Sequence, residues 1–428
     1  MDKKIFISNY EFMILVCTII SVSNQLSLPM ALASVSQQDA WITFFFPLVY
    51  SIIVVFLLFR LMRQFPGENL FEISKSICGK WVGGVLNLLL IGYLFYDLVI
   101  NLRIHADFFN STMLIRTPIE FILLLTIGLI IFFARGSIEV LARASSLFFP
   151  IFFILGLITP FILLNEIDLT EIQPILTKGS SSLIKGGVLG IGGFGDIIAL
   201  GAFLNNMKNP RGLYVSCKSG IIVSSFILTV WTFLVISVFG ATSSSRIIYL
   251  GWVLVKQIHI TDFLDRVDLV IFSFWLPNLI IKYSILYLAI LIGLASFTKS
   301  KNYKPINVLT GILVTLVALV AFKNVDEVVW ANNYAMAPLT FCIHIIFFCT
   351  IFAVLLFRKM RSVSDQAQQK DSKLIWVGLF GCAAAIGASD FLGHSFGIYG
   401  IVCGTLYSFF LFISVIFSLM EFRNLDNG

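Results

Sequence analysis

The chain has 428 residues, of which 58% are hydrophobic and only 12% are charged. Because a soluble domain carries about 25% charged residues, this composition excludes an ordinary soluble protein and indicates one that crosses a membrane many times. The net charge of +6 does not point to nucleic acid, since the lysines and arginines stand at the ends of apolar segments. The lipid bilayer is the expected partner, and a nucleic acid is not.

Apolar segments of bilayer length recur from one end of the chain to the other. In lipid each segment must satisfy its own backbone, so we expect helices throughout. Ten helices are predicted to form a body over residues 1–357, followed by a basic cytoplasmic linker at 358–373 and an added two-helix hairpin and tail at 374–428. The twelve predicted spans lie at about residues 10–33, 41–61, 83–101, 119–134, 144–164, 183–204, 217–239, 270–296, 306–322, 336–357, 374–389 and 398–420.

Charge asymmetry predicts the orientation of these spans. With a cytoplasmic N-terminus, the cytoplasmic segments hold 20 of the 29 basic residues, whereas acidic residues gather in the outer loops. The positive-inside rule therefore predicts that both termini are cytoplasmic. The first residues show no cleavable-signal pattern and no lipidation motif. In the outer loop 241–268 the apolar piece IIYLGWVLVKQIHI predicts a short helix on the outer face, or one that dips into lipid.

The sixth predicted span, Leu183–Leu204, carries six glycines and then Asp196. Glycine weakens a helix by up to about 1 kcal/mol relative to alanine, and a carboxylate at membrane depth is rare unless it faces protein or water. Such an interruption is typical of a transporter binding site. A glycine-rich helix packed tightly against its neighbours is the alternative for the glycines alone.

The first span is interrupted in a similar way. Polar residues at Ser21, Ser23, Asn24 and Gln25 come just before Pro29, which predicts a helix that ends at mid-membrane. Spans one and six each begin a block of five spans. Matching interruptions at these positions are expected of two inverted five-helix repeats with a binding site between them.

Two further spans carry polar residues at membrane depth. In span three, Tyr93, Asp97 and Asn101 follow one another at intervals of four, so they share one helix face. This stripe either lines a site or forms a buried hydrogen-bond network. In span eight, Lys282 lies about midway, where a charged lysine needs a carboxylate or carbonyl partner.

Other kinds of site are not predicted. The seven cysteines are scattered without a CxxC pair, which is typical of small buried side chains. The four histidines, His105, His259, His344 and His394, are not spaced for a metal ion and neighbour no nucleophile pattern. The glycines of span six lack the Lys-Ser/Thr ending of a phosphate loop. We therefore expect no metal, no cofactor and no enzymatic activity.

The chain resembles the spore-germination receptor B-subunit family (GerAB-like), part of the amino acid–polyamine–organocation transporter superfamily. The matching pieces occur in family order over about residues 5–357 and are QQDAW (37–41), RQFPGENLFEISKSICGKWVG (63–83), ARGSIEVLARASSLFFPIFF (134–153), NEIDLTEIQPIL (165–176), HITDFLDRVDLV (259–270), IKYSILYLAILIGLA (281–295) and KNYKPI (301–306). Two departures stand out. Family members typically stop after ten spans, and GFGDI in span six replaces a commoner Phe-Pro and Glu pattern.

The resemblance implies an all-α, LeuT-like 5+5 inverted repeat with discontinuous helices 1 and 6. It also implies a sensor of amino acids or other small germinants in the spore inner membrane, working beside an A subunit and a C-subunit lipoprotein. We expect the ligand between spans one, three, six and eight. The candidate ligand-binding residues are Ser21, Ser23, Asn24, Tyr93, Asp97, Gly190, Gly192, Gly193, Phe194, Asp196, Tyr283 and Tyr287.

Free backbone N–H groups at Ser21–Asn24 and at Gly190, Gly192 and Gly193 would favour a ligand carboxylate. Asp196 is the nearest carboxylate for a ligand ammonium. Tyr283 and Tyr287 match positions that line the pocket in the family. In LeuT-like relatives span eight packs beside the break in span one, where some hold a sodium ion. Our hypothesis is that the Lys282 ammonium replaces that ion on carbonyls near Ser21–Gln25, and the alternative is an ion pair with Asp97 or Asp196.

Three functions stay open at the level of sequence. The first is a germinant-sensing receptor subunit, which requires a ligand with different affinities for two conformations. The second is a proton-coupled amino acid transporter in which Asp97 or Asp196 carries the proton. The third is a scaffold with a vestigial site. The identity of the germinant and the role of residues 374–420 are not predicted.

Overall fold

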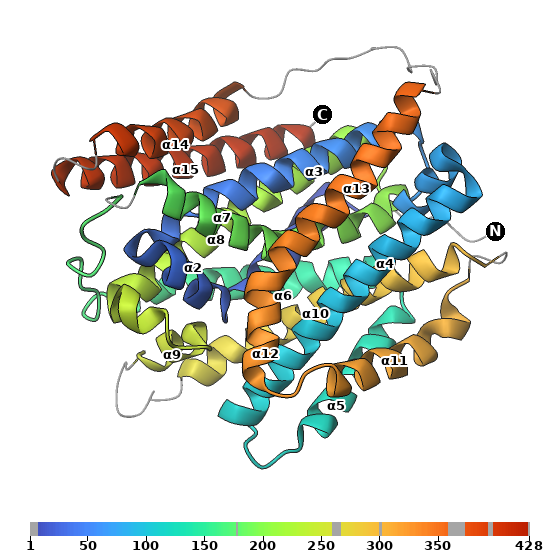
Figure 1. Ribbon diagram of the computed structural model, residues 1–428, viewed down its shortest axis with the longest axis horizontal. Coiled ribbons are helices and arrows are strands. Elements are labelled where there is room, and N and C mark those ends of the chain that lie inside the picture. Colours follow the sequence, from blue (N-terminus) through green and yellow to red (C-terminus); the bar gives the residue numbers. More distant parts are fainter. Residues whose placement is uncertain are drawn as a thin grey trace.

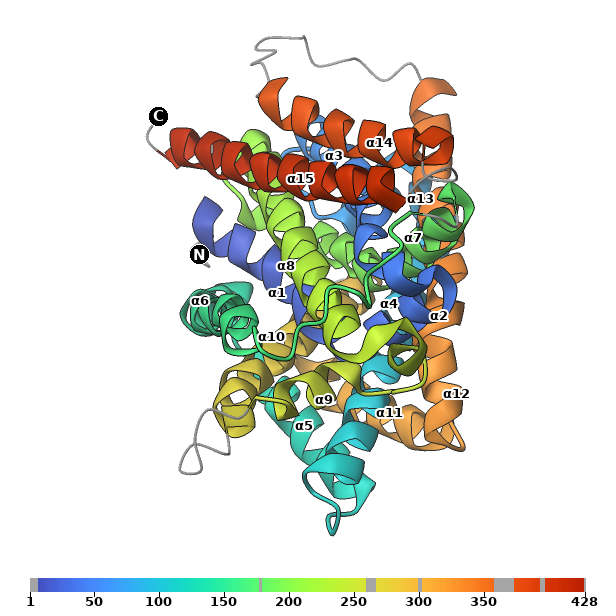
Figure 2. The same ribbon diagram turned by 90° about the vertical axis from the view of Figure 1, so that its left-hand side faces the viewer.

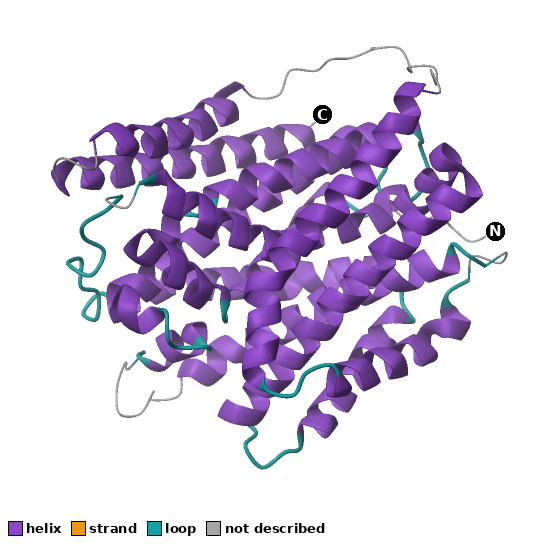
Figure 3. Cartoon of the chain, in the orientation of Figure 1, coloured by secondary structure: helices purple, strands orange, loops and turns teal. Residues whose placement is uncertain are grey.

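The computed structural model describes residues 7–176, 179–258, 267–298, 302–357, 373–392 and 397–426. Over these ranges the chain forms helices and no strand (Figure 3). The helices are α1 (Asn9–Asn24), α2 (Leu28–Ser36), η1 (Gln37–Ile42), α3 (Phe45–Gln64), α4 (Leu70–Thr112), α5 (Ile119–Ala134), α6 (Ile138–Ile162), α7 (Ser180–Phe194), η2 (Gly195–Asn206), α8 (Pro210–Ser244), α9 (Leu250–Lys256), α10 (Val267–Ala295), η3 (Lys304–Ile306), α11 (Asn307–Val320), α12 (Val325–Trp330), η4 (Ala331–Ala335), α13 (Met336–Phe357), α14 (Lys373–Leu392) and α15 (Gly397–Asp426).

The predicted spans can be compared with these helices one by one. Eight helices in the described ranges are long and apolar enough to cross a membrane, and the bent pair formed by α1 with α2 and η1 makes a ninth. The three remaining predicted spans coincide with shorter apolar helices, namely Ile119–Ala134, Lys304–Val320 and Ile375–Ala388. Hydropathy therefore located every helix of bilayer type, and the chain is an integral, multi-pass membrane protein.

Span one is broken as predicted. Helix α1 starts at a capping box in which Ser8 and Glu11 bond each other's backbone N–H groups. It ends at Asn24, and α2 begins at Leu28 with Pro29 in its first turn, where the missing proline N–H is not needed. The two halves meet at an angle of 66°. The break leaves backbone groups at Val22–Leu26 free to bond with other spans.

Span six is not unwound at its glycines as predicted, but changes its helix type farther along the chain. The chain stays helical through Gly190, Gly192 and Gly193, and after Phe194 it tightens from an α-helix into the 3₁₀-helix η2. An unwound backbone at the glycines is therefore not observed. Their small size admits neighbours instead, because a Cβ on Gly187 would collide with Phe46 and one on Gly190 would touch Pro47. The packing alternative explains these glycines.

The spans surround a buried centre, and the two additional helices lie outside it. Figures 1 and 2 both show α14 and α15 side by side at one edge of the body, with α15 against α8. The ammonium of Lys218 on α8 lies 2.8 Å from the carboxylate of Glu421 on α15, and both side chains are buried. Ser418 donates a hydrogen bond to Ser219 at 2.8 Å. The added hairpin is thus fastened to the body by polar contacts.

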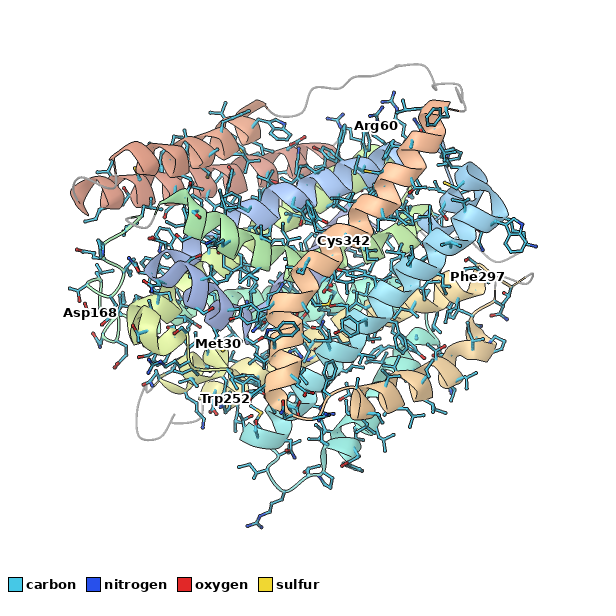
Figure 4. All side chains as sticks on the ribbon, in the orientation of Figure 1. Met30, Arg60, Asp168, Trp252, Phe297 and Cys342 are labelled. Atoms are coloured by element: carbon cyan, nitrogen blue, oxygen red, sulfur yellow. The ribbon has the colours of Figure 1, made fainter. Side chains whose placement is uncertain are left out.

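Two loop predictions have different outcomes. The segment after α8 contains the predicted short helix, α9, whose residues Leu250, Trp252, Leu254 and Val255 are buried against the body. Figure 4 shows Asp168, in the loop after α6, at the left edge of the view and Arg60, near the end of α3, close to its upper edge, and the orientation of the termini stays a prediction. The predicted linker 358–373, apart from Lys373, lies outside the described residues, as do His259 and His394.

Candidate functional site

The centre of the site is an ammonium group held between three spans. Lys282 Nζ on α10 lies 2.6 Å from Asp196 Oδ2 on η2, and both side chains are 1% exposed. The same ammonium donates a 2.5 Å hydrogen bond to Ser23 Oγ at the end of α1. A buried charge requires such partners because burial removes its hydration. Lys282 therefore joins spans eight, six and one at a single point.

These contacts decide between the two hypotheses for Lys282. The lysine pairs with Asp196, which is the ion-pair alternative, and it reaches span one through the Ser23 hydroxyl instead of the predicted carbonyls. Carbonyls at the break have other donors: Val22 O accepts from Trp275 Nε1 at 2.9 Å, and Gln25 O accepts from Trp231 Nε1 at 3.1 Å. The expected tether exists, but it has a different chemistry.

A second carboxyl group lies beside this ion pair. Asp97 on α4 is buried, and its Oδ1 accepts a 2.9 Å hydrogen bond from Asn101 Nδ2. Asp97 also interacts electrostatically with Asp196 and with Lys282. No other described residue donates a hydrogen bond to Asp97 Oδ2 or Asp196 Oδ1, and the two carboxyl groups lie within hydrogen-bond reach of each other, so that a proton on one would bond the other. Two ionised carboxylates against one ammonium would leave a buried net charge of about −1, so the site requires one more proton or one more cation.

A narrow polar cavity connects these groups, with room for little more than a water molecule. Asn24 closes one side by donating hydrogen bonds to Ile20 O at 2.6 Å and Gly193 O at 2.9 Å, which ties span one to span six. The cavity is lined by Ser23, Asn24, Leu28, Asp97, Asn101, Gly192, Gly193, Asp196, Lys282, Asn332 and Met336.

Other predicted site residues lie near this cavity without lining it. Ser21 bonds within its own helix, to Cys17 O at 2.6 Å. Tyr93 OH bonds Thr340 Oγ1 at 3.0 Å beside Gly195, and Phe194 packs against Phe44. Gly190 contacts Pro47 of α3.

The two predicted tyrosines of α10 support the surrounding helices. Tyr283 OH bonds Asn101 O at 3.1 Å and His105 Nδ1 at 2.5 Å, so it lies one layer behind Asp97. Tyr287 OH donates to Asn307 O, at the start of α11. The structure thus brings Ser23, Asn24, Asp97 and Asp196 together with Lys282 and leaves the tyrosines outside the cavity wall.

Span ten contributes residues that sequence reasoning missed. Between α12 and α13 the chain makes a π-helical turn, Ala331–Ala335, of the kind that often marks functional sites. Asn332 lines the cavity, and its Nδ2 donates to Asn333 Oδ1 at 2.8 Å and to Ser27 Oγ at 3.4 Å. The available signal was the Asn332–Asn333 pair directly before the predicted span 336–357.

The sequence model of the family described as "Spore germination protein" matches residues 6–328. The chain belongs to this spore germination protein family. Two relatives from Bacillus subtilis (strain 168) are similar to it. The putative spore germination protein YfkT is 27% identical over 311 residues, which cover 71% of this chain and 84% of the relative. The spore germination protein YndE is 22% identical over 330 residues, which cover 75% and 89% of the two chains.

Solved structures show the fold of this family member. The transporter MhsT in complex with L-phenylalanine has a TM-score of 0.59 at 14% identity, covering 95% of this chain and all 100% of that one. A Na⁺-coupled sialic acid symporter in a substrate-bound, outward-open state has a TM-score of 0.60 at 11% identity, covering 97% and 90% of the two chains. The predicted LeuT-like fold is confirmed. The family match ends before α13, so α14 and α15 lie beyond it.

Proposed function

We propose that this chain is the B subunit of a nutrient germinant receptor that senses a small, amino-acid-like germinant in the polar cavity. Its membership of the spore germination protein family supports the role. It acts in the spore inner membrane, with both termini cytoplasmic, beside an A subunit and a C-subunit lipoprotein. Residues 1–357 form the receptor body, and residues 374–428 add a hairpin to it.

The observation that carries this proposal is the pair of unsatisfied carboxylate oxygens. Asp97 Oδ2 and Asp196 Oδ1 are buried, lack donors within the described chain and belong to residues that line the same cavity. A ligand ammonium would give both oxygens a donor and would neutralise the excess negative charge. An anionic or apolar ligand would leave this charge uncompensated.

The opposite side of the cavity suits a carboxylate. Helix α2 begins at Leu28, so the Leu28 N–H and the positive end of the helix dipole lie at the break, whereas Pro29 has no N–H and the Met30 N–H already donates to Ser27 O at 3.2 Å. The Asn332 amide stands nearby. An amino acid thus finds acceptors on spans three and six and a donor on span one, and on span ten the Asn332 amide can donate to it after giving up its bond to Ser27 or Asn333. The cavity must widen to admit it, since the described state holds little more than one water.

Ligand binding would alter the bonds that hold Lys282. An incoming ammonium competes with the lysine for Asp196, and weakening that pair loosens the contact with Ser23 on the broken span. A ligand that binds the loosened conformation more tightly shifts the population toward it. The partner subunits then read the new position of span one.

Equilibrium binding to the purified chain in lipid nanodiscs, with radiolabelled amino acids, tests the proposal. An Asp97→Asn variant should weaken binding about 10–100-fold, because a charge-assisted hydrogen bond contributes about 1.5–3 kcal/mol. An Asp168→Asn variant is the control, since Asp168 is in a loop away from the cavity and its carboxylate accepts hydrogen bonds from Thr170. Equal binding by the wild type, Asp97→Asn and Asp168→Asn would refute the assignment of the site. No binding by any of these proteins would favour the hypothesis of a scaffold with a vestigial site.

A proton-coupled amino acid transporter is the second candidate, because one proton shared by Asp97 and Asp196 would correct the same charge imbalance. Uptake into proteoliposomes under an imposed pH gradient separates the two functions. Binding without uptake supports the sensor. Uptake that follows the pH gradient and is lost in Asp97→Asn supports the transporter.

A further inference from the structure

A second cavity, apolar in character, lies against the break in span one. It is narrow, with a volume of about 40 Å³, is open on one side and is lined by residues of α6, α8, α9, α10 and the break itself. Gln25 and Leu26 form its inner end, with Trp231 of α8 and Trp275 of α10 beside them. This cavity thus contacts the same broken segment whose neighbours Ser23 and Asn24 line the polar site.

Apart from the Gln25 amide at its inner end, the wall of this cavity offers little polar surface to a hydrophilic ligand. None of the described residues that line it is charged. Both indole N–H groups are already used, by Gln25 O and Val22 O. The hydroxyl of Thr159 donates to Leu155 O at 2.9 Å. An occupant therefore gains contact area with aromatic and aliphatic carbon, which favours a hydrocarbon.

The mouth of the cavity opens between two membrane-spanning helices. Helix α6 packs chiefly against α1 and α10 and touches α8 at few points. Only 22% of its apolar stretch is buried, and Leu157 at the mouth is 38% exposed. A Cβ added to Gly156 would meet nothing within 4 Å. In a bilayer the molecules at such a mouth are lipid tails.

The cavity continues along the surface of α8. An adjoining apolar cavity of about 330 Å³ shares Phe226 and Val230 with the first and reaches Ile167 and Leu411 of α15. The two cavities meet at Phe226 and Val230 and together form a crevice that follows α8 from the break to α15. A flexible chain fits this shape better than a compact molecule does.

We propose that the crevice between α6 and α8, from Ile167 to Gln25, is a binding site for one acyl chain of a membrane phospholipid. The inner end of the chain packs against Trp231 and Trp275 and so holds their indoles on the carbonyls of the break. The site is separate from the polar cavity and does not depend on the proposed germinant. Through it, acyl chains of the membrane stabilise the described conformation of span one.

Photo-crosslinking tests this proposal with the full chain in proteoliposomes that contain a phosphatidylcholine bearing a diazirine in one acyl chain. Peptide mass spectrometry should place crosslinks on residues 226–231. A Gly156→Leu variant fills the crevice and should reduce these crosslinks about tenfold, because interiors have no spare volume for both groups. A Gly128→Leu variant on α5, where an added Cβ also meets nothing within 4 Å, is the matched control and should crosslink normally.

Undiminished labelling in Gly156→Leu would overturn the proposal. Loss of labelling when L-phenylalanine is added would also overturn it, since the crevice would then belong to a small-molecule ligand.

Quenching of tryptophan fluorescence by acyl-brominated phosphatidylcholine provides a second test, which does not rely on Gly156→Leu folding. The quenched fraction of tryptophan fluorescence should fall in Trp231→Phe and not in Trp252→Phe, because Trp252 does not line the crevice. Equal quenching in both variants would contradict an acyl chain at this place.

Discussion

Lys282 Nζ and Asp196 Oδ2 lie 2.6 Å apart although 86 residues separate them in the sequence, and neither side chain is more than 1% exposed. A buried ion pair of this kind adds little net stability relative to apolar groups, but removal of one partner leaves an uncompensated charge. The pair therefore makes spans six and eight dependent on each other.

We expect Lys282→Met to destabilise the protein by about 3–5 kcal/mol, because Asp196 and Asp97 would then share the cavity without a counter-charge. The double variant Lys282→Met/Asp196→Asn removes both charges and should recover more than half of that loss. Urea unfolding in detergent measures both differences. If the double variant is no more stable than the single one, the cost does not arise from the ion pair.

Substitution of Gly193 should separate spans one and six. An added Cβ would lie 2.2 Å from Asn24 Oδ1, so Gly193→Ala must displace the Asn24 side chain and should destabilise by about 1–3 kcal/mol. Gly92→Ala is the matched control, since a Cβ there meets nothing within 4 Å and alanine should stabilise the helix by about 0.4–1 kcal/mol. Thermal unfolding compares the two, and a loss of equal size in both would show that the Asn24 contact is unimportant.

The ion pair between Lys218 and Glu421 should stabilise the packing of the α14–α15 hairpin against α8. Lys218→Met leaves Glu421 buried without its partner at the α8–α15 contact, so hydrogen exchange in α15 should accelerate by at least about tenfold. Arg143→Met is the control, because Arg143 is 71% exposed and its pair with Glu139 contributes about 0–1 kcal/mol. Unchanged exchange in Lys218→Met would mean that apolar contacts alone fasten the hairpin.

Asn332 should affect ligand affinity and leave stability nearly unchanged. Its amide lines the cavity at the start of α2, so Asn332→Ala should weaken amino acid binding about tenfold, the effect of losing one neutral hydrogen bond. Thr350→Ala, in the same span but on an exposed face, should bind normally. Isothermal titration calorimetry gives both affinities. If Asn332→Ala binds the amino acid with normal affinity, the ligand contacts spans one, three, six and eight and not span ten.

The sequence was sufficient for the spans, because a long apolar run has few alternatives in lipid. It also placed the break in span one, where Ser23 and Asn24 precede Pro29. It could not choose a partner for Lys282, since helical periodicity relates only residues within one helix. Glycines give the same signal whether they unwind a helix or let it pack, so Gly190 was misread. No pattern of residues in the sequence predicts the π-helical turn Ala331–Ala335.

The cation at the break in span one is the ammonium of the Lys282 side chain and not a dissolved ion. This determines how the described conformation depends on the salt concentration outside. A dissolved cation at that place would exchange with the medium and leave when its concentration fell. The Lys282 ammonium is covalently attached to α10, so its occupancy of the contact with Ser23 is independent of the salt outside. A protein built in this way keeps this contact when the salt concentration around it changes, and under the proposed function only a molecule able to compete for Asp196 would break it.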